Sequence, residues 1–448
     1  MSEKTEIFLN LISFLKKENI DYAVLGNTTS FPYVIGSDVD IVVTEQSFKT
    51  SDNWIKQFCN EFEYTICNYL QHEIKAKSFV VAKINPKNLL TTFIAIDVCS
   101  DYYRDGRLLI NYCSLLENKI VFTTSEDIEC AFNIPNDRIA FIYYFIKKIE
   151  KNSFNEEQIQ YLSKTFSSER ELLQLELRNI FSQKHANLIF DIFIKKQFSR
   201  LTPSFLNELK VFLLKKFRIT IKDQFSELLR NLKRIVKPTG IWIAFMGCDG
   251  AGKSTLINLL NGENFPEQAF RKSAYFHLYP SYSANKVGQV LPNPHDQIKR
   301  SSLLSNIKVI YLFFRYTAGY WIIIYPKRIK STLVIFDRYY HDLLVDQIRY
   351  RHGGGLALAK LVGNLMPKPE LFFFIDAPVK TILSRKQEVP YEEVKRQKNE
   401  YLLMAKKMDN GYVIDNSHDP KTGVFSIEEI IVNYLNRRHK KRTYKHEK

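Results

Sequence analysis

The residues best suited to chemistry lie in one short segment of the chain. This segment reads Gly247-Cys248-Asp249-Gly250-Ala251-Gly252-Lys253-Ser254-Thr255. Its three glycines permit backbone conformations in which consecutive N–H groups point at phosphate oxygens. Lys253 can reach the β- and γ-phosphates of a nucleotide, and the Ser254 hydroxyl can bind Mg²⁺. The segment therefore predicts a binding loop for a nucleoside triphosphate and Mg²⁺. Its nucleotide-binding residues would be Gly247, Asp249, Gly250, Ala251, Gly252, Lys253, Ser254 and Thr255.

The residues on either side supply the strand and the helix that such a loop needs. An apolar run at 241–246 precedes the loop, and 255–260 has the composition of a helix. The start of a helix adds a favourable dipole for an anion. A Gly-rich turn before a helix is the alternative, which we disfavour because both flanking elements stand at the required positions.

Two later strand ends carry ionisable side chains. The apolar run 333–336 ends at Asp337-Arg338, and the run 371–375 ends at Asp376. A carboxylate at a strand end can bind Mg²⁺ or orient an attacking oxygen, so we assign catalysis and metal binding to Asp337. Arg338 can hold an acceptor phosphate, because its planar guanidinium matches an anion bidentately.

Arg385 and Arg396 follow in a segment rich in basic residues, the second of them in a predicted helix over 391–407. Mobile arginines beside a γ-phosphate stabilise the charge of the transition state and help to exclude water. We therefore take both as candidate catalytic residues. On local evidence, a solvated helix face explains each of them equally well.

A second group of carboxylates lies nearer the N-terminus. Asp38 and Asp40 stand at i and i+2 of a predicted strand, so both point to one face. Such a face can hold divalent metal ions that bridge the phosphates of a nucleotide. Asp97, in the apolar run 93–98, is placed to supply a third carboxylate, and Gly26 follows the preceding strand. A simple Asp-x-Asp turn is the alternative.

Composition bounds the class of protein. The chain has 448 residues, of which 45% are hydrophobic and 25% charged, as in a soluble globular protein of two to three domains. Its six cysteines never form a Cys-x-x-Cys pair, which argues against a disulfide framework or a zinc cluster. We see no apolar leader at the N-terminus and predict a cytoplasmic protein.

The net charge of +16 is concentrated in basic segments at 215–218, 230–237 and 437–448. Such charge attracts phosphates, nucleic acid or an anionic membrane surface. The basic residues form no single stripe interleaved with aromatics, so nucleic acid is not the expected partner, whereas a peripheral membrane contact stays open. The apolar run 309–325 contains Arg315 and is short for a membrane span, so we expect a buried helix of the kinase core, with a membrane-facing surface as the alternative. For 437–448 we expect a solvated, disordered tail.

These candidate sites fall in regions of different secondary structure. Residues 1–125 mix predicted helices and strands, and residues 126–236 are mostly helical and contain no glycine. Residues 237–436 alternate strands and helices, which predicts an α/β domain with a parallel sheet, followed by the basic tail 437–448.

Asp337-Arg338-Tyr339 and the segment 367–370 before a strand, together with the loop at 247–255, resemble the thymidylate kinase family of P-loop kinases. The resemblance covers roughly the last 200 residues. It implies ATP with Mg²⁺, bound by Lys253 and Ser254. It also implies that Asp249 faces the acceptor, that Asp337 and Arg338 serve the acceptor and the metal, and that Arg385 and Arg396 are lid arginines.

The acceptor side departs from that family. Thymidylate kinases carry Arg-Glu-Pro after their second strand, where this chain has His277-Leu278-Tyr279-Pro280, and the residues at 340–351 differ as well. The stretch 336–342 and the basic stretch from Arg385 to Gln397 are similar to a subgroup linked with surface-polysaccharide or lipopolysaccharide biosynthesis. That resemblance implies an acceptor other than dTMP, such as a sugar or glycan hydroxyl.

The N-terminal pattern resembles another family. Gly26 after a strand, followed by Gly36-Ser37-Asp38-Val39-Asp40, is similar to the nucleotidyltransferase superfamily with its DNA polymerase β-like fold. The resemblance implies an α+β domain over residues 1–125, in which Asp38, Asp40 and Asp97 bind metal. The usual small residue after Gly26 is Asn27 here, so a domain that binds nucleotide or glycan without reacting is an alternative.

We therefore expect a phosphotransferase that moves the γ-phosphoryl group of ATP to a nucleotide, sugar or glycan, with an accompanying nucleotidyltransferase-like domain. One alternative is a regulatory or defence-type NTP-binding protein without kinase turnover, which would tolerate the loss of Asp337. Another is a nucleotidyltransferase that acts on nucleic acid, which steeply salt-dependent binding would favour. The sequence identifies neither the acceptor nor the oligomeric state.

Overall fold

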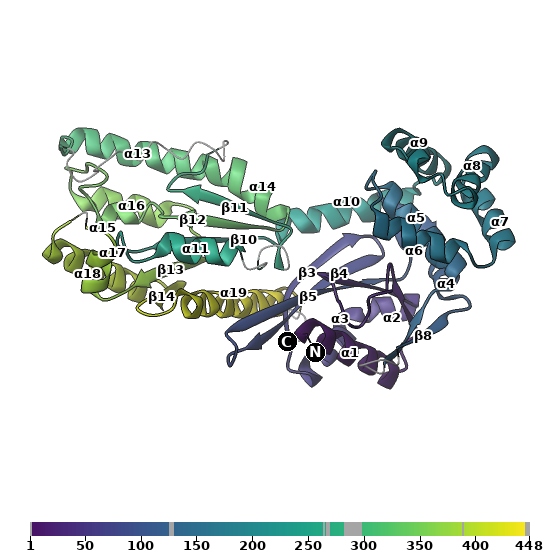
Figure 1. Ribbon diagram of the computed structural model, residues 1–448. Coiled ribbons are helices and arrows are strands. Elements are labelled where there is room, and N and C mark those ends of the chain that lie inside the picture. The colour runs from purple at the N-terminus through teal and green to yellow at the C-terminus, as the bar shows by residue number, and fades with distance from the viewer. Residues whose placement is uncertain are drawn as a thin grey trace. The chain divides into compact units, whose positions relative to one another are not determined.

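A computed structural model of the chain describes residues 2–124, 130–262, 265, 269–281, 298–387 and 389–443 (Figure 1). The chain divides into two compact units. Unit one comprises Met1–Lys83 and Thr92–Lys233, and unit two comprises Ile84–Thr91 and Arg234–Lys448. The expected boundary at 125/126 lies outside the described residues.

Unit one contains a five-stranded sheet in the order β1-β2-β5-β4-β3. Its strands are β1 (Tyr22–Leu25), β2 (Asp38–Val43), β3 (Thr65–Glu73), β4 (Ala76–Asn85) and β5 (Leu90–Cys99). β2 runs parallel to β5 and antiparallel to β1. The hairpins β6–β7 (Tyr102–Arg104, Arg107–Ile110) and β8–β9 (Ile120–Thr124, Cys130–Ile134) follow. The helices in this part are α1 (Glu3–Lys17), α2 (Glu45–Lys49), α3 (Ser51–Glu61) and α4 (Tyr112–Leu116). The mixed helix and strand content expected for this region is confirmed.

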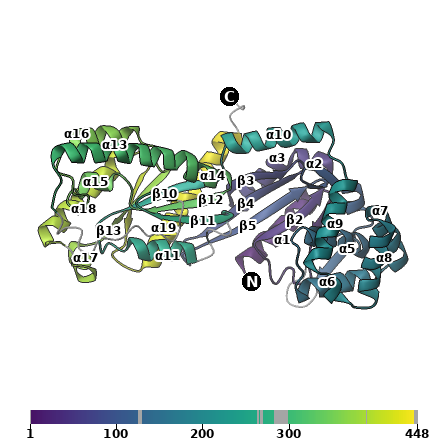
Figure 2. The ribbon, with the colours of Figure 1, turned by 90° about the horizontal axis from the view of Figure 1, so that it is seen from above.

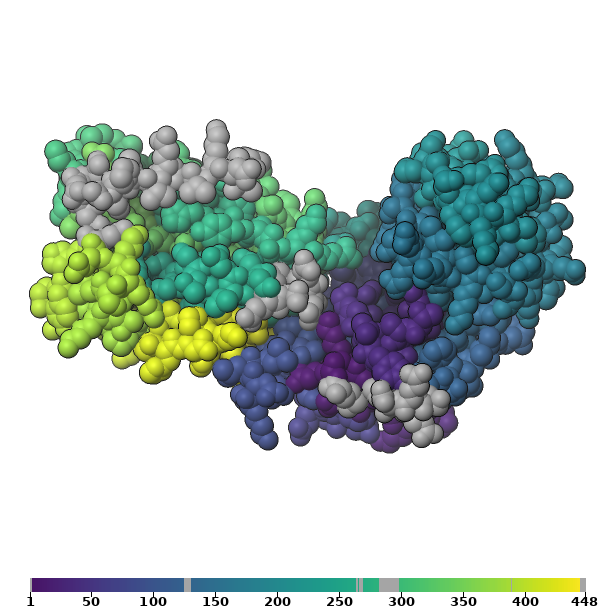
Figure 3. All heavy atoms as spheres, in the orientation of Figure 1, coloured from purple at the N-terminus to yellow at the C-terminus, as the bar shows by residue number. Residues whose placement is uncertain are grey.

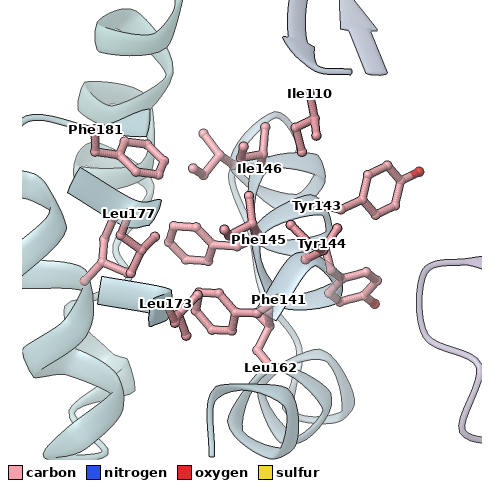
Figure 4. Close-up of a cluster of buried hydrophobic side chains, with 14 of the residues drawn as sticks. Ile110, Phe141, Tyr143, Tyr144, Phe145, Ile146, Leu162, Leu173, Leu177 and Phe181 are labelled. Carbon is pink, nitrogen blue, oxygen red and sulfur yellow. The ribbon is translucent and has the colours of Figure 1, made fainter. Parts of the chain in front are cut away.

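The helical part of unit one begins at α5 (Asp137–Ile149). It continues through α6 (Glu156–Phe166), α7 (Arg170–Ile180), α8 (Gln183–Ile194), the short turn η1 (Phe198–Arg200), α9 (Pro203–Lys216) and α10 (Ile221–Val236). Phe141 and Phe145 of α5 point toward Leu173 and Leu177 of α7 (Figure 4). The same core includes Ala23, Leu25 and Val42 of the sheet. We expected a separate helical region, but it shares a compact unit with the sheet because one core serves both.

Unit two is built on a parallel sheet of five strands in the order β11-β12-β10-β13-β14. The strands are β10 (Ile241–Met246), β11 (Lys272–His277), β12 (Thr332–Asp337), β13 (Leu371–Asp376) and β14 (Gly411–Asp415). Every residue of the central strand β10 is buried, as a strand covered on both faces requires. This order places the carboxyl end of β10 between those of β12 and β13.

Helices cover both faces of this sheet (Figure 2). They are α11 (Lys253–Gly262), α13 (Ser302–Gly319), the π-helical turn η3 (Tyr320–Ile324), α14 (Tyr325–Ile329), α15 (Asp342–Val345), α16 (Leu356–Leu365), α17 (Val379–Arg385), α18 (Tyr391–Lys407) and α19 (Pro420–Thr443). One core joins Trp242, Ala244 and Met246 of β10 to apolar residues of α13, α15, α16 and α18. Contacts between α11 and α19 place these two helices together.

Two expectations for unit two need correction. The apolar run 309–325 is helical, as expected, from α13 through η3 to the first residue of α14, and one face of it lies in the core. The other face is not buried: Phe314 and Trp321 are 64% and 59% exposed. Within the described chain, one continuous helix, Ser302–Ile329, has the length and hydropathy of a membrane span, and 33% of its most apolar stretch is buried. Length and composition alone are weak evidence for a span, since core helices of soluble proteins share them.

The basic tail is the second correction. Helix α19, yellow in Figure 3, continues to Thr443. Arg438 donates to the carbonyl of Gly240 at 2.8 Å, and Arg442 donates to that of Pro238 at 2.9 Å. These bonds order the tail as far as Thr443, because they satisfy carbonyl groups at the start of β10. Residues 444–448 of the expected tail lie outside the described residues.

Candidate active site

The glycine-rich loop curls tightly between β10 and α11. Gly247, Gly250 and Gly252 adopt φ angles of 141°, 84° and 97°, a region that side chains disfavour. A Cβ atom at Gly252 would overlap the side-chain amide of Asn416, so glycine is also needed there for space. Asn416 donates to the carbonyl of Ala251 at 2.8 Å. The loop is thereby fixed against the end of β14.

Lys253 begins α11 and is buried against the loop. Its Nζ donates to the carbonyls of Gly247 and Cys248, both at 2.8 Å. Burial lowers the pKa of Lys253, and the nearby charge of Arg338 lowers it further. The side chains of Ser254 and Thr255 lie on the exposed first turn of α11. This arrangement gives an anion a cation, a helix start and a hydroxyl in one place.

Asp337 ends β12, the neighbour of β10, and pairs in register with Phe245. Its Oδ2 accepts a hydrogen bond from the Tyr275 hydroxyl at 3.2 Å and lies 3.7 Å from His277 Nδ1. Burial would raise the pKa of Asp337, but His277, Lys253 and Arg338 outweigh it and lower that pKa. Within the described chain, its buried Oδ1 has no hydrogen-bond partner. An ionised carboxylate with an unpartnered oxygen, together with the Ser254 hydroxyl, fits the oxygen ligands that Mg²⁺ prefers.

Arg338 is held by two carboxylates. Its φ is 70°, a strained value for a residue with a side chain, and its N–H donates to the Phe245 carbonyl at 2.9 Å. Nη1 donates to Asp342 at 2.6 Å and Nη2 donates to Asp249. Burial would lower the pKa of Arg338, but Asp342 and Asp249 raise it well above its ordinary value. Backbone strain that is held in place by a buried ion pair is typical of functional sites.

Further members of this network were not found from the sequence. Asp342 is fully buried and also accepts hydrogen bonds from Tyr350 at 3.0 Å and from Tyr401. Arg349 donates to Asp249 and, at 3.0 Å, to Asp346. The i,i+4 spacing of Arg338 and Asp342 was an available signal, whereas Tyr401 joins from a distant helix that no local pattern connects.

The two predicted lid arginines lie in different places. Arg385, at the end of α17, has Nη1 3.5 Å from the Ala251 carbonyl and Nη2 3.3 Å from the Asn416 carbonyl, so it borders the glycine-rich loop. Arg396, on α18, binds Glu393 at 2.7 and 2.8 Å and the Val345 carbonyl at 2.9 Å. Its side chain is 47% exposed. Arg385 is therefore placed beside the donor loop, and Arg396 beside α15.

The N-terminal carboxylates form a separate cluster in unit one. Asp40 pairs in register with Asp97, and one oxygen from each of Asp38, Asp40 and Asp97 lies within 4.8 Å of the others. Burial and the charge of Asp40 raise the pKa of Asp97 to about 7. In the described chain, Oδ1 of Asp97 is buried without a hydrogen-bond partner. Clustered carboxylate oxygens of this kind fit a divalent cation.

Lys147 of α5 also belongs to this cluster, and the sequence did not identify it. Its Nζ lies 2.5 Å from Oδ2 of Asp40. Burial would lower the pKa of Lys147, but Asp40 raises it above its ordinary value. Gly26, with a φ of 95°, directly follows the neighbouring strand β1. The structure thus brings all three predicted carboxylates together and adds a cation from the helical part.

Comparison with known proteins identifies the C-terminal part of the chain. A family model described as thymidylate kinase matches residues 245–418. The chain is 29% identical over 189 residues to "Probable thymidylate kinase 1" of Saccharolobus solfataricus. The aligned part covers 40% of this chain and 89% of that protein. It is 28% identical over 205 residues to a thymidylate kinase of Fervidobacterium nodosum, which covers 42% of this chain and 94% of that protein.

A solved thymidylate kinase from Ehrlichia chaffeensis is 19% identical in sequence, with a TM-score of 0.33. The aligned part covers 43% of this chain and 98% of the solved chain. The family match and the curated relatives show that unit two carries a thymidylate kinase-like P-loop kinase domain. The parallel sheet with the glycine-rich loop after its central strand agrees with that assignment.

Proposed function

We propose that unit two transfers the γ-phosphoryl group of ATP to a nucleotide, sugar or glycan acceptor. The observation that carries this proposal is that a lysine and a carboxylate lie next to the ends of two adjacent strands. Lys253, the first residue of α11, is buried against the loop after β10, and Asp337 at the end of β12 has a carboxylate oxygen without a hydrogen-bond partner among the described residues. P-loop kinases need a cation at the transferred phosphate and a carboxylate that serves the metal or the acceptor.

Each residue then has a physical task. Lys253 stabilises the charge that develops on the transferred group, and Arg385 beside the Ala251 carbonyl can add a second cation. Asp337 is ionised at neutral pH and can orient the acceptor oxygen. Mg²⁺, held by Ser254 and Asp337, would neutralise charge on the β- and γ-phosphates when bound.

The residues around Asp249, where we expect the phosphoryl acceptor to bind, favour an acceptor other than dTMP. Arg338 and Arg349, two basic residues of this acceptor side, are bound by Asp249, Asp342 and Asp346. An incoming monophosphate would have to displace Asp249 from both arginines, which leaves a partly buried carboxylate without its partners. A hydroxyl group of a sugar or glycan could instead accept or donate a hydrogen bond at Asp249 without displacing it.

The test is a phosphorylation assay with labelled ATP and a panel of acceptors: dTMP, dUMP, other nucleoside monophosphates, free sugars and glycan fragments. Lys253→Ala is the control for the donor site. Asp337→Asn separates a kinase from a regulatory NTP-binding protein, because only the kinase loses turnover. ATP binding without transfer to any member of the panel would refute the kinase proposal and favour the regulatory alternative.

For unit one we propose metal-dependent nucleotidyl transfer. The cluster of Asp38, Asp40 and Asp97 supports it, together with Lys147 against Asp40. Paired carboxylates on one sheet face suit two-metal transfer, and a lysine beside them can bind the triphosphate of the incoming nucleotide. Release of pyrophosphate from labelled NTPs, with oligonucleotides and small molecules as separate acceptors, tests this activity. Asp38→Ala must abolish the release, and a rate unaffected by this change would refute the proposal.

A further inference from the structure

Three basic side chains of unit two lie together, and no carboxylate of the described residues pairs with them. Arg300 precedes α13, Lys308 lies within it, and Arg351 follows α15. Lys308 Nζ and Arg300 Nη1 both donate to the carbonyl of Tyr350, at 3.0 and 3.3 Å. Arg351 Nε donates to the carbonyl of Ile298 at 2.9 Å, and the Arg300 N–H donates to the Arg351 carbonyl at 3.0 Å. Among the residues that the structure describes, none of these three cations forms an ion pair.

Such an arrangement is electrostatically unfavourable. All three side chains are only partly exposed, so water screens their mutual repulsion incompletely. Burial, followed by the charges of Arg300 and Arg351, lowers the pKa of Lys308 to about 8. Elsewhere in the same unit, Arg328 is paired with Glu370 and Arg338 with Asp342. Like charges gathered without a counter-charge are a feature of sites that bind an anion.

The backbone around the three cations is held in place. A Cβ atom at position 353 would overlap the Arg300 carbonyl, so only glycine fits there. The N–H of Gly353 donates to Ser305 Oγ of α13 at 2.9 Å. The segment before α13 and the loop before α16 are thereby locked together, which fixes Arg300 and Arg351 relative to Lys308. A preorganised group of cations binds an anion at less entropic cost than mobile surface side chains.

A single residue connects this group to the candidate active site. The Tyr350 carbonyl accepts from Arg300 and Lys308, while its hydroxyl donates to Asp342, which binds Arg338. The three cations therefore lie one tyrosine away from the acceptor side. An anion bound there could therefore be part of a molecule that the active site also holds.

We propose that Arg300, Lys308 and Arg351 form a second anion-binding site, which takes a phosphate group carried by the phosphoryl acceptor at a distance from its reacting hydroxyl. Two guanidinium groups and an ammonium group match the charge and the several oxygens of a phosphate ester. The proposal deepens the proposed kinase function and rests on it for the identity of the ligand as the acceptor. It explains how an acceptor can be bound through charge although Arg338 and Arg349 are paired with carboxylates.

Binding of inorganic phosphate tests the site without any turnover. The full chain is saturated with a non-hydrolysable ATP analogue and Mg²⁺, so that the β- and γ-phosphate positions of the P-loop are filled, and phosphate binding is measured by equilibrium dialysis with labelled phosphate. We expect one site, weakened at least tenfold by Lys308→Met and by Arg351→Gln. Lys360→Met, which removes an exposed cation from nearby α16, should change the affinity less than twofold. Lys253→Met should retain the site.

Equal affinity in the wild type and in Lys308→Met would overturn the proposal, as would loss of binding in Lys253→Met alone. Competition by DNA or RNA at much lower concentration than by phosphate would assign the cations to a nucleic acid and would also overturn it. Once an acceptor is known, Lys308→Met should raise its KM at least tenfold with little change in kcat. An unchanged KM would refute the role in acceptor binding. Failure of the kinase proposal would appear separately, as ATP binding without phosphoryl transfer.

Discussion

Replacement of Lys308 by methionine should make unit two more stable, not less. The stem of Lys308 is partly buried, and its charge faces Arg300 and Arg351 without a carboxylate among the described residues. Methionine keeps a similar apolar length and removes the charge, and the Tyr350 carbonyl keeps its hydrogen bond from Arg300 when that from Lys308 is lost. A gain in stability on loss of a polar side chain is unusual, because most substitutions destabilise. It is expected where function, not folding, retains the charge.

The magnitude follows from the pKa. The pKa of Lys308 falls from 10.5 to about 8 because burial and two arginines disfavour its charged form. For a fully buried group that difference would correspond to roughly 3 kcal/mol. Lys308 is only half-buried, so solvent screening reduces the expected penalty to about 1–2 kcal/mol. For a unit of this size the melting temperature should rise by about 2–8 °C.

The sign of the pH dependence is also defined. Because the folded-state pKa lies below that of the unfolded chain, the unfolded state binds more protons between about pH 8 and 10.5. The penalty is therefore fully present below pH 8 and is relieved as the pH rises toward 10.5. The stability difference between Lys308→Met and the wild type should shrink over the same window.

Differential scanning calorimetry between pH 7 and 10.5 measures this effect, and the transition that shifts with ADP and Mg²⁺ reports on unit two. Lys360→Met serves as the matched control, because it removes an exposed charge from the same unit. A variant that is less stable than the wild type at pH 7 would refute the reasoning. So would a stability difference that stays constant from pH 7 to 10.5.

Three other substitutions test other parts of the structure. Gly252→Ala should abolish ATP binding and destabilise unit two by at least ~1 kcal/mol, because φ at this position is 97° and the new Cβ would overlap Asn416. Equilibrium binding of ATP and calorimetry measure the two effects. Asp342→Asn should lower the free energy of unfolding in urea by about 3–5 kcal/mol, because it leaves Arg338 buried without one of its two carboxylates. A decrease as small as that of the exposed control Asp419→Asn would contradict the importance of this network. Asp40→Asn should weaken Mn²⁺ binding to the carboxylate cluster in unit one at least tenfold. Ser254→Ala is the control for the glycine-rich loop of unit two. Unaltered Mn²⁺ binding in Asp40→Asn would argue against a metal at the carboxylate cluster.

Much of unit two could be read directly from the sequence. The strand at 241–246, the glycine-rich loop and the helix after it were predicted at their observed positions, because their signals are local: an apolar run, three glycines and a helix start. Asp337 and Arg338 were found for the same reason, since a charged pair directly after a buried strand marks a strand end. In unit one, Asp38 and Asp40 were recognised by strand periodicity.

The partners of these residues depended on the tertiary structure. Tyr401 reaches Asp342, Lys147 reaches Asp40, and Arg300 and Lys308 share the Tyr350 carbonyl, each across long stretches of chain that packing alone brings together. The helical part of unit one joined the sheet for the same reason, because one apolar core serves both.

The sequence alone thus predicted which residues have the chemistry to bind a nucleotide and a metal, since backbone freedom and side-chain chemistry are properties of single residues and short segments. The tertiary structure alone decided which charges are paired and which are not. Pairing depends on distance and burial, and both arise only when the strands and helices pack.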